Sequence, residues 1–224
     1  MRNKLLKDNI LLFSIYAVLF FCCLALLLCY SKVDISLIIN GLNNRFLDYF
    51  FKFLTEFGTF TLISPIIILL AFLSFRRALT AISASILASL LTQVGKHLVW
   101  PNSPRPKMVF ESLQNIHLHL VEGVRLHNAH SFPSGHTTGA FALFMVLALF
   151  SKKPSVKIGC LLLACLVGYS RLYLLQHFLT DVVAGSLIGI VSAVFCYWWF
   201  TSSFSNKAVW MDKSIRLPWK SSID

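Results

Sequence analysis

The chain has 224 residues, of which 57% are hydrophobic and only 13% are charged, and its mean hydropathy is +0.72. Soluble domains carry roughly 25% charged residues, so a water-soluble fold of this length cannot bury so much apolar surface. The net charge of +11 does not indicate nucleic-acid binding, because the basic residues cluster in short segments between apolar runs. The composition therefore predicts an all-α polytopic membrane protein.

Six apolar runs are predicted to form transmembrane helices. They are Ile10–Tyr30, Thr61–Phe75, Ala78–Gly95, Thr137–Phe150, Ile158–Leu175 and Val182–Phe200. The first run is long for a signal peptide and lacks a small-residue cleavage site, so we expect it to be retained. The second run is short, so its helix is expected to begin earlier or to tilt. Residues 34–59 are predicted to form an amphipathic segment at the membrane interface.

The distribution of charge predicts how the helices are oriented. Six spans place both termini on one side, where twelve basic and three acidic residues give a net charge of +9, against +2 on the other side. The positive-inside rule assigns the terminal side to the cytoplasm, which places the polar loop Trp100–Ser131 outside. We expect a single domain over 1–224 in a bacterial inner membrane. It has an N-terminal span and interfacial segment (1–60), a core of about 61–200 and a cytoplasmic tail (201–224).

Three polar clusters lie at the outer ends of the predicted helices. The first holds Lys96 and Arg105-Pro106-Lys107, the second Pro133-Ser134-Gly135-His136, and the third Ser170-Arg171, His177 and Asp181. Polar residues at the ends of neighbouring apolar helices converge if those helices form a bundle. Convergence from three separated segments is what an active site requires.

The residue types in these clusters suit phosphate chemistry. Cations such as Arg171 bind phosphoryl oxygens, and the N–H groups of a helix that starts at Ser134 form an anion site. Ser134 is a natural helix cap; as an alternative it is a nucleophile, although its segment is not a GxSxG elbow. Asp181 follows His177 by four residues and on a helix would share its face, fixing the imidazole tautomer for nucleophilic attack. His136 is then available as the acid that protonates the leaving oxygen.

Together the three clusters resemble the signature motifs of the type 2 phosphatidic acid phosphatase superfamily over roughly residues 61–200. The resemblance implies a six-helix membrane core, related to the soluble haloperoxidases, and hydrolysis of a lipid phosphate through a phosphohistidine without a metal or other cofactor. It implies His177 as nucleophile, Asp181 as its orienting group and His136 as acid and base. It also implies that the phosphate is held by Lys96, Arg105, Ser134, Gly135 and Arg171.

The first motif departs from the family pattern, because eight residues rather than six separate Lys96 from Arg105-Pro106. A bulged loop containing Pro101 and Pro104 would still deliver both cations. Lys107 is the alternative cation for this position and a candidate headgroup ligand.

Two other functions fit part of the sequence. Five further histidines suggest a metal site, but their spacing matches no metal-binding pattern, and we expect them to line the mouth of the site. These are His97, His117, His119, His127 and His130. A transporter or channel for an anionic solute is the main alternative to an enzyme, although no charged residue lies in the middle of an apolar run as drawn.

The substrate is expected to be a lipid phosphate, and no nucleic acid or obligatory protein partner is indicated. The family range includes phosphatidic acid, phosphatidylglycerol phosphate, undecaprenyl pyrophosphate and lipid A phosphates. The long loop slightly favours the bulkier two, lipid A and undecaprenyl pyrophosphate.

Overall fold

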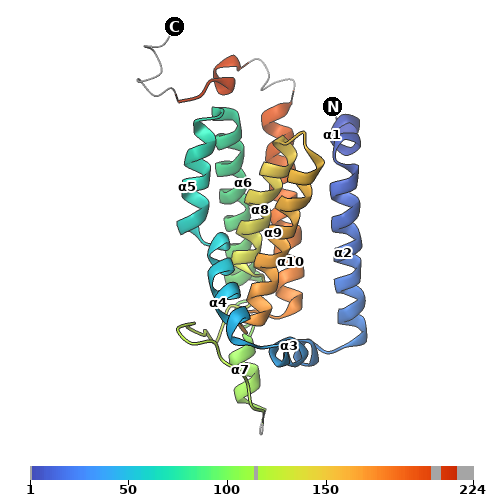
Figure 1. The fold of residues 1–224 in the computed structure, drawn as a ribbon, viewed down its shortest axis with the longest axis vertical. Helices are drawn as coiled ribbons and strands as arrows, with labels where there is room; N and C mark the ends of the chain where they lie inside the picture. Colours follow the sequence, from blue (N-terminus) through green and yellow to red (C-terminus); the bar gives the residue numbers. More distant parts are fainter. Residues whose placement is uncertain (1, 114–115, 203–207, 216–224) are drawn as a thin grey trace.

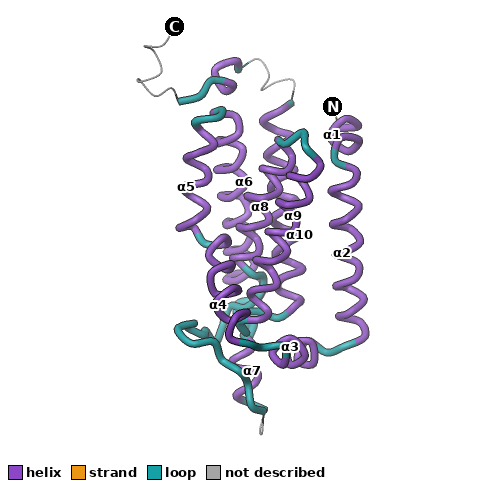
Figure 2. The backbone as a smooth tube through the Cα atoms, in the orientation of Figure 1, coloured by secondary structure: helices purple, strands orange, loops and turns teal. Residues whose placement is uncertain are grey.

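The computed structural model describes residues 2–113, 116–202 and 208–215, and this part of the chain contains helices and loops but no strand (Figure 2). The α-helices are α1 (Arg2–Asp8), α2 (Ile10–Cys29), α3 (Lys32–Gly41), α4 (Arg45–Leu54), α5 (Phe60–Ala71), α6 (Phe75–Val94), α7 (Pro106–Glu111), α8 (Gly135–Phe150), α9 (Pro154–Tyr173) and α10 (Leu179–Thr201). Short helical turns add η1 (Thr55–Gly58), a π-helical turn η2 (Gly95–Val99) and η4 (Val209–Asp212).

Each of the six predicted apolar runs overlaps a helix, but the count of six spans is not confirmed. Four helices are long and apolar enough to cross a membrane: α2, α6 with its π-helical turn, α9 and α10. A fifth span results only if α4, η1 and α5 are taken as one unit, which bends by 55°. Helix α8 has 16 residues, which corresponds to about 24 Å at 1.5 Å per residue and falls short of ~30 Å of hydrocarbon. Neighbouring helices surround α8, so it does not have to match the bilayer thickness by itself.

The segment predicted to lie at the interface forms two helices with different placements. Helix α3 lies across the end of the bundle, whereas α4 runs along it and continues through η1 toward α5 (Figure 1). Asn44 caps α4 by accepting the N–H of Leu47 at 2.9 Å. The interfacial placement of α3 stays a prediction, whereas α4 joins α5 in the bent pair that can form one span.

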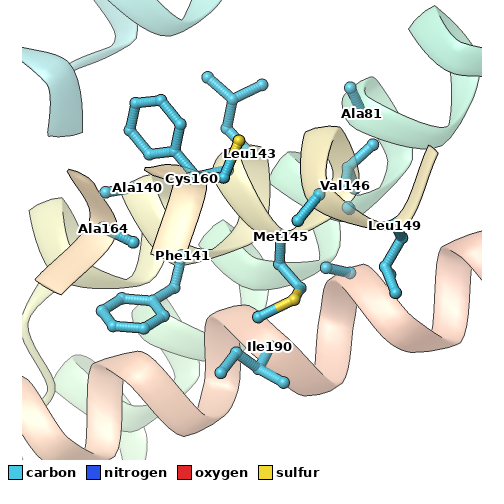
Figure 3. Close-up of a cluster of buried hydrophobic side chains, with 14 of the residues drawn as sticks. Ala81, Ala140, Phe141, Leu143, Met145, Val146, Leu149, Cys160, Ala164 and Ile190 are labelled. Atoms are coloured by element: carbon cyan, nitrogen blue, oxygen red, sulfur yellow. The ribbon is translucent and has the colours of Figure 1, made fainter. Parts of the chain in front are cut away.

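The core is built around α8, which packs against α6, α9 and α10. Its residues Phe141 and Met145 lie among buried side chains that include Ala81 of α6 and Ile190 of α10 (Figure 3). Small residues bring the backbones close, and three alanines of the Ala- and Ser-rich helix α6 are fully buried. They are Ala81, Ala84 and Ala88.

A pair of glycines in α10 also permits close packing against α8. A Cβ on Gly185 would lie 2.7 Å from the carbonyl oxygen of Ser134, and one on Gly189 would lie 2.6 Å from that of Thr138. Only glycine permits α10 to approach α8 so closely, and this approach fixes the start of α8 against the start of α10.

The two ends of the bundle differ. Helix α1 and the turn η4 lie at one end, whereas α3 and α7 lie at the other (Figure 1). At the first end Arg76 binds the carboxylate of Asp212 at 2.7 and 3.0 Å. The expected tail at 201–224 falls partly outside the described residues, at 203–207 and 216–224. The second end carries the three motifs.

Candidate active site

A polar cavity of about 320 Å³ lies at the end of the bundle that carries α3 and α7. Its lining comes from α4, η1, η2, the start of α8, the end of α9 with the turn after it, and the long loop. Five cationic side chains and one carboxylate face it: Lys52, Lys96, Arg105, Arg125 and Arg171 against Glu56. His127, Gly135, His136 and His177 also line the cavity. An excess of positive charge around two histidines suits an anionic ligand.

His177 forms a buried pair with Asp181. Its Nδ1 lies 3.3 Å from Oδ2 of Asp181, and only 2% of the imidazole side chain is exposed. The predicted pair is present, but its placement on one helix is wrong: His177 lies in the turn before α10, whereas Asp181 lies in the first turn of that helix. The Asp181 carboxylate also accepts the N–H of Phe178 at 3.0 Å, so it caps the helix and holds the imidazole together.

Ser131 completes this pair. Its hydroxyl donates to Oδ2 of Asp181 and lies 3.4 Å from Nδ1 of His177. Because Nδ1 faces this carboxylate, Nε2 is the imidazole nitrogen left for a ligand.

Burial lowers the pKa of His177 below its ordinary value, and the charges of Arg171 and Arg105 act in the same direction. The hydrogen bond to Asp181 opposes this shift. The imidazole is therefore neutral at neutral pH, which leaves a lone pair on the ring.

The start of α8 forms the second part of the site. Ser134 occupies the predicted cap position, but its side chain does not cap the helix, because its hydroxyl accepts a hydrogen bond from the hydroxyl of Thr137 at 2.8 Å. Ser134 is fully buried and does not line the cavity, whereas Gly135 and His136 do. The first backbone N–H groups of a helix have no intrahelical partner, so this end of α8 can bind an anion.

Three cations predicted from the motifs all reach the cavity. Arg171 is 6% exposed and donates from Nη1 to the hydroxyl of Thr55 at 2.6 Å, while its Nε is buried without a hydrogen-bond partner in the described structure. Arg105 donates to Oε1 of Gln176 at 3.2 Å and to the carbonyl of Ala129 at 3.0 Å. An unpaired buried guanidinium nitrogen is costly unless a ligand satisfies it.

The longer spacing of the first motif does not remove Lys96 from the site. Lys96 lies on the π-helical turn after α6 and donates to the carbonyl of His130 at 2.6 Å. Lys107, the alternative cation, lies on α7, 3.7 Å from the carboxylate of Glu111, and is not among the residues that line the cavity.

The loop histidines have different surroundings. His127 lines the cavity, as predicted for the group. His119 instead contacts the carboxylate of Asp48 at 2.9 Å, and the rings of His97 and His130 lie 4.7 Å apart. Within the described ranges no three His, Cys, Asp or Glu side chains gather as a ligand set for a metal ion.

Several lining or supporting residues were not predicted. Thr55 and Ser131 hold motif side chains, but a lone threonine or serine far away in sequence gives no signal. Gln176 immediately precedes His177, and its position within the third motif was the available signal. Lys52 and Arg125 are exposed cations, and their sequence context does not distinguish them from other basic residues near a membrane surface.

The fold defines an integral membrane protein with a cavity lined by histidines and cationic side chains at one end of a helical bundle. A model of the PAP2 superfamily matches residues 77–205, more than half of the chain, and the protein belongs to this superfamily. The matched region contains all three motifs.

Solved structures and curated relatives agree with this assignment. The crystal structure of Aquifex aeolicus LpxE is similar with a TM-score of 0.64 and 30% identity, covering 73% of this chain and 92% of that one. A transmembrane PAP2-type phosphatidylglycerolphosphate phosphatase from Bacillus subtilis shares the fold at a TM-score of 0.62 and 23% identity, covering 89% of this chain and 96% of that one. The lipid A 4'-phosphatase of Porphyromonas gingivalis is 27% identical over 169 residues, which cover 73% of this chain and 70% of that protein.

Other relatives match over shorter segments. Lipid phosphate phosphatase 1 of Arabidopsis thaliana is 35% identical over 111 residues, 44% of this chain and 34% of that protein. The chain thus spans about a third of the length of several curated relatives that it matches.

Proposed function

We propose that this protein is a membrane lipid phosphatase that uses His177 as its nucleophile. The observation that carries the proposal is the buried His177–Asp181 pair beside a cavity lined by five cations. A phosphate monoester in this cavity would meet a neutral imidazole whose other nitrogen faces a carboxylate. The polar groups gather at one end of the bundle, which favours chemistry on a headgroup over passage of a solute through the bundle.

In the first step Nε2 of His177 attacks phosphorus, and the bond between phosphorus and the lipid oxygen breaks. Burial and the charge of Arg171 lower the pKa of His136, so we infer that His136 takes up a proton when the phosphate dianion binds beside it. His136 then gives this proton to the leaving oxygen, which departs as the lipid alcohol. Asp181 stabilises the positive charge that develops on the His177 ring, and Ser131 holds the carboxylate in place.

In the second step water attacks the phosphohistidine and releases inorganic phosphate. His136, now neutral, accepts the proton of the water, and the bond between phosphorus and His177 breaks. Throughout, Lys96, Arg105 and Arg171 bind the phosphoryl oxygens together with the N–H groups at Gly135, and Ser134 supports this helix start from behind. The cations supply the charge stabilisation that a metal ion provides in other phosphatases, so we infer a metal-independent reaction.

The distribution of charge supports one orientation in the membrane. The basic excess on the terminal side favours a cytoplasmic location for α1, so we infer that the cavity opens at the outer face. A lipid with its phosphate at this interface and its chains in the bilayer would reach the site directly. We infer a bacterial inner membrane and a substrate among lipid A phosphate, undecaprenyl pyrophosphate, phosphatidylglycerol phosphate and phosphatidic acid. The relatives named as lipid phosphatases support this range.

Phosphate release from these four lipids by the purified protein tests the proposal. We expect release from at least one lipid, unchanged by a chelator, and a loss of ~10³–10⁶ in rate for His177→Ala. Normal turnover by His177→Ala would refute the mechanism. Activity lost in chelator and restored by zinc would refute metal independence.

A further inference from the structure

A second polar hollow of about 410 Å³ adjoins the catalytic cavity. The two share Lys52 and Gly123 in their linings. The second hollow is otherwise lined by Arg45, Asp48, Tyr49, Val121 and Glu122. Its size falls in the range of about 300–1,000 Å³ that is usual for small-molecule sites. The mechanism proposed above uses none of these residues.

Helix α4 forms one wall of both hollows. Arg45, Asp48, Tyr49 and Lys52 recur at the three- and four-residue spacing that puts side chains on one helix face. This face continues into η1, where Thr55 holds Arg171. Arg45 lies seven residues, or about 10 Å, along the helix from Lys52, so the face leads away from the reacting phosphate.

The opposite wall comes from the loop and is attached to α4 at Lys52. The Lys52 ammonium group donates to the carbonyl of Glu122 at 2.8 Å. Gly123 has a φ of +73°, and a Cβ there would lie 2.6 Å from Nζ of Lys52. Glycine therefore permits both the turn of the loop and its close approach to α4.

The charges of the second hollow differ from those of the catalytic cavity. Arg45 and Lys52 are balanced by Asp48 and Glu122, so this hollow has no excess of positive charge. Within the described residues the side chains of Arg45 and Tyr49 make no hydrogen bond, and 64% of Tyr49 is exposed. A neutral set of donors and acceptors beside an exposed aromatic ring suits a hydroxyl-rich ligand better than a second phosphate.

We propose that this hollow is a subsite for a sugar, so that the phosphate removed in the adjoining cavity is carried by a glycosyl headgroup. The inference rests on the proposed function and narrows its substrate class. Ring hydroxyls would bind the charged groups of Arg45 and Glu122, and the sugar would lie against Tyr49.

The test compares two lipids with the same acyl chains: a diacylated glucosamine 1-phosphate and phosphatidic acid. We expect the wild-type protein to favour the glucosamine lipid in kcat/KM. Tyr49→Ala and Arg45→Gln should each lower this preference about 10-fold by raising KM, the effect of losing one contact worth ~1.4 kcal/mol. Both side chains are exposed, and thermal unfolding in detergent checks that the variants fold.

Tyr30→Ala and Lys107→Gln are the matched controls. Tyr30 is 51% exposed at the same end of the bundle but lies outside both linings, and Lys107 lies on α7. Neither should change the preference. Equal use of both lipids by the wild type, or a preference that survives both test variants, would overturn the subsite and leave the lipid phosphatase intact. Failure to hydrolyse either lipid would also overturn the subsite, whereas the proposed function is overturned only if none of its four candidate lipids releases phosphate.

Discussion

The backbone N–H of Ser134 donates to the carbonyl oxygen of Asp181 at 3.0 Å, which joins the start of α8 to the start of α10. One helix start carries His136 and the other follows His177, so this bond links the segments that bear the two histidines. The close approach of α10 to α8 at Gly185 and Gly189 makes the bond available.

This packing gives a first prediction. Gly189→Ala should destabilise the protein by about 1–3 kcal/mol, because its methyl group would meet the backbone of α8 at Thr138 and Ala142. Gly159→Ala is the control, since nothing lies within 4 Å of a Cβ at that position of α9. Denaturant unfolding in detergent measures both. Equal stability of the two variants would contradict the packing account.

The support that Ser131 gives to Asp181 can be measured by kinetics. Ser131→Ala should lower kcat about tenfold and leave KM nearly unchanged, because it removes a hydrogen bond that positions the nucleophile without touching substrate. Ser112→Ala is the control, since Ser112 donates only to the carbonyl of Val109. A rise in KM with unchanged kcat would assign Ser131 to substrate binding instead.

Much of the fold and site could be predicted from the sequence, because apolar runs and polar motifs are local signals that can be recognised without knowing the fold. The helix starting at Gly135 and the convergence of the three motifs follow from such local signals. The position of His177 in a turn could not be predicted in this way, because the four-residue spacing between His177 and Asp181 fits a continuous helix equally well. The bent pair of α4 and α5 also escaped prediction, because its polar face contacts a loop about 70 residues further along the chain.

The first motif provides a direct comparison of two lysines. Lys96→Ala should reduce kcat/KM for the lipid substrate by ~10²–10³, the cost of removing one preorganised group that stabilises transition-state charge. Lys107→Ala should leave kcat/KM unchanged, because Lys107 is paired with Glu111 outside the cavity. The reverse order of effects would show that the loop delivers the other lysine to phosphate.

The buried imidazole predicts how stability depends on pH. Burial lowers the pKa of folded His177 below 6.5, so in the window beneath 6.5 the unfolded chain binds a proton that the folded chain does not. Stability is therefore fully present above that value and is lost as the pH falls toward the lowered pKa. The thermal midpoint in detergent should drop between about pH 7 and about pH 5, and drop less in His177→Asn. An identical drop in both proteins would assign the effect to other groups.

The identity of the nucleophile is tested most directly by trapping the covalent intermediate. Purified protein is mixed with a lipid carrying a ³²P-labelled phosphate, quenched within its first turnover, and examined for labelled protein. We predict label that is stable in base and labile in acid, located on His177 and absent from His177→Ala, whereas Lys107→Ala should label like the wild type. Label on another residue, or rapid phosphate release from the wild type without any labelled protein under these conditions, would contradict the assignment of His177.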